Sequence, residues 1–183
     1  MGKEATLLQQ ARRFEAAALA EIYDTYSPEL YRYATRLLGN SQWGEECVAE
    51  TFSRLLHALN NGGGPTDHVR AYLYRVAHNW ITDTYRRQPL PPLPLDPQWC
   101  ADETSNPVQF VGKQLEQERV RAALYHLTPE QRQVIVLRFL EGWTNEEVAT
   151  VMGKTVGAVK ALHQRGLAAL RRMLVEQETE RVL

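Results

Sequence analysis

Apolar side chains recur along this chain at three- and four-residue intervals, which is the spacing of helices that bury one face. The helices predicted from this pattern cover approximately residues 15–26, 28–39, 41–61, 66–88, 111–127 and 127–142. Pro28 is expected at the first turn of the second of these helices, because proline is tolerated at that position. No stretch of the sequence sustains the alternation that is typical of strands, so the pattern predicts an all-α fold.

Residues 144–166, TNEEVATVMGKTVGAVKALHQRG, hold two further helical patterns that meet at one glycine. Thr144 and Glu147 match the capping box that starts a helix, and Gly153 suits the left-handed residue that ends one. Thr155 can cap the helix that follows. A turn this short predicts a helix-turn-helix, although a packed helical hairpin with no role in DNA binding remains the alternative.

The outward face of the second helix of this pair combines small residues with long polar ones. Small side chains at a helix start let the backbone approach a groove, and Lys, Gln and Arg beyond them can bond phosphates and base edges. The candidate groove-facing residues are Thr155, Gly157, Ala158, Lys160, Ala161, Gln164 and Arg165.

A proline-rich stretch separates the two helical halves of the sequence. Residues 88–107 contain six of the nine prolines, which remove backbone donors and favour an extended chain. We therefore expect two small helical domains, residues 1–88 and 113–176, joined by an extended linker over residues 89–112. Residues 177–183 would form a C-terminal tail.

The formal net charge of −1 conceals an uneven distribution along the chain. Residues 1–88 hold ten basic and ten acidic side chains, whereas residues 89–118 hold one lysine and five acids. Residues 128–174 hold seven basic and four acidic side chains, a net +3. Only this last segment has the charge of a phosphate-binding surface.

Several classes of protein are excluded by what the sequence lacks. The two cysteines are far apart without a CxxC motif, and the histidines lack the spacing of metal ligands, so we expect no metal. Without a P-loop, dinucleotide fingerprint or GxSxG motif, we expect no cofactor and no enzymatic activity. No apolar run reaches the ~20 residues that cross a bilayer. The start of the chain also lacks a signal-peptide core, so we expect a cytoplasmic protein without membrane insertion.

Taken together, the two halves resemble a bacterial RNA polymerase sigma factor of the sigma-70 family. The stretch LYRYATRLLGNSQWGEECVAETFSRLLHAL, followed by VRAYLYRVAHNWITDTYRRQ, is similar to region 2. The stretch LTPEQRQVIVLRFLEGWTNEEVATVMGKTVGAVKALHQRGLAALRRML is similar to region 4. The resemblance covers roughly residues 10–88 and 113–174, and the short linker is typical of the extracytoplasmic-function (ECF) class.

The resemblance implies that core RNA polymerase, with its β and β′ subunits, is the main partner. In the family the third helix of region 2 grips a coiled coil of β′, and an acidic helix edge with an exposed aromatic suits a basic partner. The residues implied for this contact are Glu45, Glu46, Glu50, Thr51, Phe52 and Arg54. The alternative is a solvated charged face with Phe52 in the core.

The resemblance also implies two contacts with promoter DNA, to single-stranded DNA at the −10 element and to duplex DNA at the −35 element. His78 and Asn79 would form a loop that holds a flipped base, and nearby arginines would bind phosphates. The residues implied at −10 are Arg75, His78, Asn79, Arg86 and Arg87. At −35 the second helix of the turn would enter the major groove, although Leu162 stands where many relatives have Arg.

The acidic linker and the remaining partners complete what the resemblance implies. In the family the linker occupies a basic channel of the polymerase, where its negative charge can mimic RNA. The linker residues implied are Asp96, Trp99, Asp102 and Glu103. An inert spacer is the alternative. An anti-sigma factor is a possible further partner.

Two other functions remain open from the sequence alone. The first is a helix-turn-helix regulator that binds duplex DNA without polymerase. The second is a helical interaction scaffold with no role in nucleic-acid binding, although the net +3 of residues 128–174 speaks against it.

Overall fold

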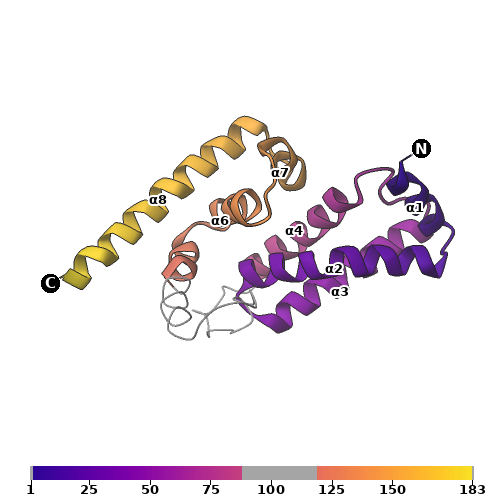
Figure 1. The fold of residues 1–183 in the computed structure, drawn as a ribbon, viewed down its shortest axis with the longest axis horizontal. Helices are drawn as coiled ribbons and strands as arrows, with labels where there is room; N and C mark the ends of the chain where they lie inside the picture. The colour runs from indigo at the N-terminus through magenta and orange to yellow at the C-terminus, as the bar shows by residue number, and fades with distance from the viewer. Residues whose placement is uncertain (1, 88–118, 183) are drawn as a thin grey trace. The chain divides into compact units, whose positions relative to one another are not determined.

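The computed structural model describes residues 2–87 and 119–182, with side chains as far as residue 175. These residues form two compact helical units (Figure 1). Every regular element within the described ranges is a helix, so the predicted all-α fold is confirmed. None of these helices has the length and apolar character needed to span a membrane.

The first unit is a bundle in which α2 packs against both α3 and α4, and α3 packs against α4. The preceding helix, α1, packs against α2 and α3 and was not predicted from the sequence. The bounds of these helices are Lys3–Arg12 for α1, Ala16–Leu38 for α2, Ser41–Asn60 for α3 and Val69–Arg87 for α4. The largest side chains fully buried between them include Ile22, Leu30, Tyr33, Leu37, Leu55, Leu73, Tyr74 and Ile81.

The predicted break before Pro28 is wrong, because α2 continues through this residue. Proline has no N–H, so the carbonyl of Asp24 loses its partner one turn earlier. Both residues are exposed, which leaves that carbonyl accessible to water. Ile22 and Leu30 are buried on either side of the proline, and a continuous helix keeps both on the core face.

A two-residue connection joins α2 to α3. Gly39 has a φ of 68° and its N–H donates to Thr35 O at 2.7 Å, which ends α2 in the left-handed conformation. The side chain of Asn40 then caps α3 by accepting from Trp43 N at 3.1 Å. The two helices approach so closely that a Cβ at Gly44 would lie 2.3 Å from Thr35 Oγ1.

The second unit begins with a helix over residues 119–126 and continues through a short helical hairpin into the long helix α8. Its elements are α6 (Pro129–Ile135), the π-helical turn η2 (Val136–Leu140), α7 (Asn145–Met152) and α8 (Val156–Val182). Thr128 and Gln131 form a capping box at the start of α6, with both hydrogen bonds at 3.3 Å. One core cluster gathers Leu124, Leu127 and Ile135 with Ala169, Leu170 and Met173.

A buried arginine closes the C-terminal end of the helix over residues 119–126. Arg132 donates to the carbonyls of Leu124 and Tyr125 at 2.9 Å and to that of Leu127 at 3.3 Å. Its guanidinium also lies 4.3 Å from the centre of the Tyr125 ring. Leu124 O also accepts from Leu127 N at 3.2 Å, and the arginine side chain supplies the further donors that carbonyls at a helix end need.

Candidate nucleic-acid interface

Helix α7, a short turn and the start of α8 form the predicted helix-turn-helix. Thr144 Oγ1 accepts from Glu147 N at 3.2 Å, and a Glu147 carboxylate oxygen accepts from Thr144 N at 2.7 Å. Gly153 has a φ of 63° where α7 ends. Thr155 Oγ1 caps α8 by accepting from Ala158 N at 3.2 Å. The caps and the turn that the sequence predicts are therefore confirmed.

The inner face of α8 is apolar and packs into the unit. Val159 is fully buried, and Ala149 is buried on α7. Leu162 is only 9% exposed, so this position belongs to the core and adds nothing to the polar face. The departure from the family pattern at Leu162 is therefore a departure in core packing in this chain.

The outer face of α8 is an exposed strip with an amide and a glycine near its middle and a cation at each edge. Residues on a helix advance by about 100° each, so Gly157 and Gln164 lie within about 20° of each other around the axis. On the same basis Lys160 lies about 40° to one side of Gln164, and Arg165 lies about 100° to the other. Among the predicted groove-facing residues, Ala161 is half-buried, and the exposed ones are Thr155, Gly157, Ala158, Lys160, Gln164 and Arg165.

His163 is partly shielded from solvent, whereas Arg165 is exposed. His163 is half-buried, with its ring centre 5.3 Å from that of Phe139. Burial lowers the pKa of His163, and the neighbouring Arg138 cation lowers it further, so this ring is neutral near pH 7. The basic character of the strip therefore comes from Lys160 and Arg165. Arg165 Nε donates to Ala161 O at 3.3 Å, which leaves the two terminal NH₂ groups to meet an anion.

Helix α4 presents a second polar strip. Arg75 and Asn79 are one turn apart, Arg86 continues the same face two turns later, and all three are exposed. At 1.5 Å per residue, Arg75 and Arg86 are about 16 Å apart along the helix axis. Arg87 is also exposed at the end of the helix. The polar strip of α4 is therefore Arg75, Asn79 and Arg86, of which Arg86 lies 4.0 Å from Asp83, whereas Arg87 lies about 100° away around the helix.

The predicted loop at His78 and Asn79 is wrong, because both residues lie inside the continuous helix α4. His78 is 7% exposed and sits one turn after the buried Tyr74, on the side that packs into the bundle. A side chain in this position is not available at the surface. Asn79, its neighbour, is exposed.

The loop of this unit lies at residues 61–68, between α3 and α4. Three of its residues have left-handed backbone conformations: Gly62 has a φ of 74°, Gly64 of 84° and His68 of 50°. Glycine adopts such angles without strain, but a histidine rarely does. The conformation at His68 is therefore one that the surrounding structure must hold in place.

The outer face of α3 is acidic, as expected, but its charges are partly paired with each other. Glu45 and Glu46 are exposed, and Glu46 accepts a hydrogen bond from Gln42 Nε2 at 3.3 Å. Glu50 and Arg54 form an ion pair at 2.7 Å, one turn apart. The negative charge that remains uncompensated along this helix is that of Glu45 and Glu46.

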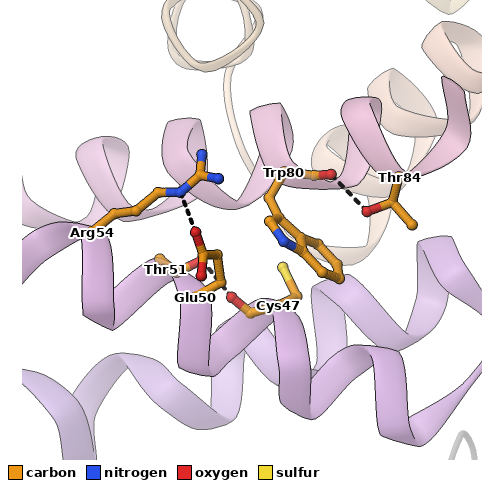
Figure 2. A network of polar contacts seen from close by, with 6 residues as sticks. All are labelled: Cys47, Glu50, Thr51, Arg54, Trp80 and Thr84. Atoms are coloured by element: carbon orange, nitrogen blue, oxygen red, sulfur yellow. Dashed lines mark hydrogen bonds and ion pairs between the residues drawn. The ribbon is translucent and has the colours of Figure 1, made fainter. Parts of the chain in front are cut away.

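Two residues predicted for the polymerase contact are interior. Figure 2 shows Thr51 beside Cys47 on α3, where its hydroxyl donates to the Cys47 carbonyl at 2.7 Å, and Thr51 is fully buried. Burial also raises the pKa of the Cys47 thiol to about 12, so this thiol is neutral. The expected exposure of Phe52 is wrong, since its side chain is only 8% exposed. In Figure 2 the Trp80 indole reaches from α4 toward the same part of α3.

Exposed apolar surface near Phe52 is provided by Tyr23 and Leu56, which the sequence analysis did not select for this contact. Tyr23 of α2 is 48% exposed, and its ring centre lies 4.8 Å from that of Phe52. Leu56 is 40% exposed one turn after Phe52. Both positions lie at the border of an apolar stripe, where spacing alone does not decide between core and surface.

The remaining predicted site residues, Asp96, Trp99, Asp102 and Glu103, lie outside the described residues, as does the linker over residues 89–112. Among the residues that are described, no group of three or more His, Cys, Asp or Glu side chains is placed to hold a metal ion.

Comparisons with known proteins bear on both units. The chain matches the family model "Sigma-70 region 2" over residues 22–89 and the model "Sigma-70, region 4" over residues 117–170. It is 31% identical over 170 residues to the ECF RNA polymerase sigma factor BldN of Streptomyces coelicolor, covering 92% of this chain and 64% of BldN. It is 32% identical over 166 residues to the ECF RNA polymerase sigma factor SigL of Mycobacterium tuberculosis, covering 88% of this chain and 92% of SigL.

The fold is also similar to a solved structure, that of CnrH in complex with the cytosolic domain of CnrY. The TM-score is 0.71 at 25% sequence identity, and the match covers 94% of this chain and 97% of that one. Since the two family models match in the order region 2, region 4, and the relatives align over most of the chain, the chain belongs to the ECF class of the sigma-70 family of RNA polymerase sigma factors.

Proposed function

We propose that this sigma factor guides core RNA polymerase through three surfaces: the outer strip of α8, the polar strip of α4 and the acidic face of α3. An ECF sigma factor is a non-catalytic polymerase subunit that directs promoter-specific initiation of transcription. The observation that carries the assignment is that α4 and α8 each present cations and an amide on one exposed face. Because its partner polymerase acts on the chromosome, the protein works in the cytoplasm.

At the −35 element the strip of α8 enters the major groove. Gly157 and Ala158 let the start of the helix approach, and Gln164 near the middle of the strip meets base edges. Lys160 and Arg165 point toward opposite edges of the strip, where the phosphates of the two strands border the groove. Sequence preference is thereby assigned to Gln164, and the salt-dependent affinity to the two cations.

At the −10 element the strip of α4 follows the melted strand. Arg75 and Arg86 are about 16 Å apart along the helix, so the two cations can meet different phosphates of the melted strand. Asn79 lies between them with both a donor and an acceptor for a base edge. We assign the base-holding loop implied by the resemblance to residues 61–68, which lead directly into α4.

The polymerase contact combines charge with an apolar anchor. Glu45 and Glu46 carry the uncompensated charge of α3, and Tyr23 and Leu56 add exposed apolar surface about 10–15 Å further along this helix. A surface that combines acids with an exposed aromatic suits a basic coiled coil, such as that implied for β′. The linker over residues 89–112 is assigned to a basic channel of the polymerase, because its three acids and the absence of any Lys or Arg give it a negative charge that can replace that of RNA there.

An anti-sigma factor is a further proposed partner. CnrH, to which this chain is similar in fold, was solved in complex with the cytosolic domain of CnrY. A protein that covers the acidic face of α3 would compete with polymerase for Glu45 and Glu46. Copurification of this chain with a partner that core polymerase displaces would support this proposal, and simultaneous binding of both would refute the competition.

Two experiments test the central proposal. A promoter is first selected from a randomised DNA library with the reconstituted holoenzyme. Run-off transcription from this promoter by core polymerase must then depend on added sigma factor, and a gel shift must require both proteins. Equal binding of the selected duplex by the sigma factor alone would favour a regulator that works without polymerase.

A further inference from the structure

Helix α1 lies at one end of the first unit and contacts the loop that leads into α4 (Figure 1). It is fixed to the bundle by Leu8 and Ala11, which are buried. Arg12 Nη2 donates to Pro65 O at 2.9 Å and to Gly64 O at 3.5 Å. This side chain therefore binds the backbone of a loop more than fifty residues away in sequence.

The other end of α1 supplies the cap for α4. The Glu4 carboxylate accepts from Val69 N at 2.8 Å, and Val69 is the first residue of α4. The first N–H groups of a helix have no partner within the helix, and a negative charge there is favourable. His68, which precedes α4, is not one of the residue types that normally cap a helix. Glu4 provides this acceptor from another helix.

The loop over residues 61–68 has a backbone that is costly to fix in one conformation. Gly62, Gly64 and His68 all have positive φ angles, and the two carbonyls that Arg12 binds lie between Gly62 and His68. Glycine-rich segments lose the most conformational freedom when they are fixed. Without contacts from α1 the loop would sample other conformations, and the start of α4 would move with it.

We infer that Glu4 and Arg12 are positioning residues for promoter opening, and that α1 acts as a brace that fixes the loop over residues 61–68 and the start of α4. The inference rests on the proposed role of α4 at the −10 element. It adds a function to a helix that lies before the family match, which begins at residue 22. Neither side chain needs to touch DNA for this role.

Holoenzymes carrying Arg12→Ala or Glu4→Ala test the brace on a selected promoter. Stable open complexes on duplex DNA are measured by permanganate reactivity of melted thymines, and we expect a loss of roughly five- to tenfold for either variant. A template already unpaired across the −10 element should restore part of the loss. Arg13→Ala is the matched control, because Arg13 is the exposed neighbour of Arg12. It should open the promoter as the unchanged protein does.

Two further measurements separate positioning from general folding. Glu4→Gln keeps an oxygen that can accept from Val69 N, so it should open promoters better than Glu4→Ala at equal helix content by circular dichroism. Amide exchange should accelerate over residues 61–69 in Arg12→Ala while core-polymerase binding is retained. Accelerated exchange with normal opening would overturn the inference. If holoenzyme with Asn79→Ala also opens the promoter normally, the proposed role of α4 at the −10 element is wrong. If Asn79→Ala is defective while Arg12→Ala and Glu4→Ala are not, only the inferred role of α1 is wrong.

Discussion

Replacing both Lys160 and Arg165 by alanine should change how binding depends on salt, while replacing Gln164 should change which sequence is preferred. The two cations lie toward opposite edges of the exposed strip of α8, and Gln164 lies between them. Phosphate contacts carry no sequence information, whereas an amide that meets a base edge does. The two kinds of variant should therefore fail in different ways.

The expected magnitude follows from the number of phosphates that are lost. Each neutralised phosphate contributes about 0.9 to the slope of log affinity against log salt, so the double variant should lose about 1.8. Between 50 and 200 mM salt, the unchanged holoenzyme should then lose about tenfold more affinity than the double variant does. Gln164→Ala should keep the full slope and lose about 1–3 kcal/mol of discrimination at one base pair.

The assay is a salt titration of holoenzyme on the selected promoter and on copies changed singly at each −35 base pair. Arg172→Ala is the control, because Arg172 is exposed but lies about 18 Å along α8 from Lys160, beyond a groove about 12 Å wide. An unchanged slope in the double variant would refute the assignment of the cations to phosphates. A uniform loss across all sequences in Gln164→Ala would refute its role in base recognition.

Three further predictions concern the other surfaces and the core. Asn79→Ala should leave closed complexes intact but reduce stable open complexes by roughly ten- to a hundredfold, because an unpaired base edge costs ~1–3 kcal/mol. Permanganate footprinting measures the open complexes. Equal opening by the variant and the unchanged protein would show that another residue makes the base contact. Glu45→Lys with Glu46→Lys should weaken association with core polymerase in a pull-down without changing the melting temperature, since both side chains are exposed; unchanged affinity would remove this face from the interface. Arg132→Met should lower the free energy of unfolding of the second unit by about 2–4 kcal/mol, because three carbonyls lose a charged donor. Urea titrations measure this change. Unaltered stability would show that water replaces the guanidinium.

Features that depend on a few neighbouring residues could be predicted from the sequence. The caps at Thr144 and Thr155 and the left-handed Gly153 are determined by neighbouring residues, and the structure has all of them. The exposed strip of α8 follows in the same way, because one apolar face determines where the polar face must be.

The features that were missed depend on residues distant in the sequence. Phe52 and Leu56 are both apolar and one turn apart, and only the packing of α2 against α3, with Tyr23 over Phe52, makes the first one interior. The brace at Arg12 is a contact across more than fifty residues to backbone carbonyls, which no side-chain pattern marks. The break at Pro28 was predicted from the preference of proline for the first turn of a helix. Burial of the turns on both sides of Pro28 overrides this preference and keeps the helix continuous.

The close approach of α2 and α3 at Gly44 has a consequence for how related sequences can change. A Cβ at this position would lie 2.3 Å from the Thr35 hydroxyl, a separation that no pair of unbonded atoms tolerates. Alanine at 44 therefore requires that the Thr35 hydroxyl rotate away or be lost, or that the two helices move apart. We expect the two positions to covary among homologues, with a side chain at 44 found beside glycine or alanine at 35. A lineage that acquires Gly44→Ala first should carry a destabilised intermediate until the second change arises.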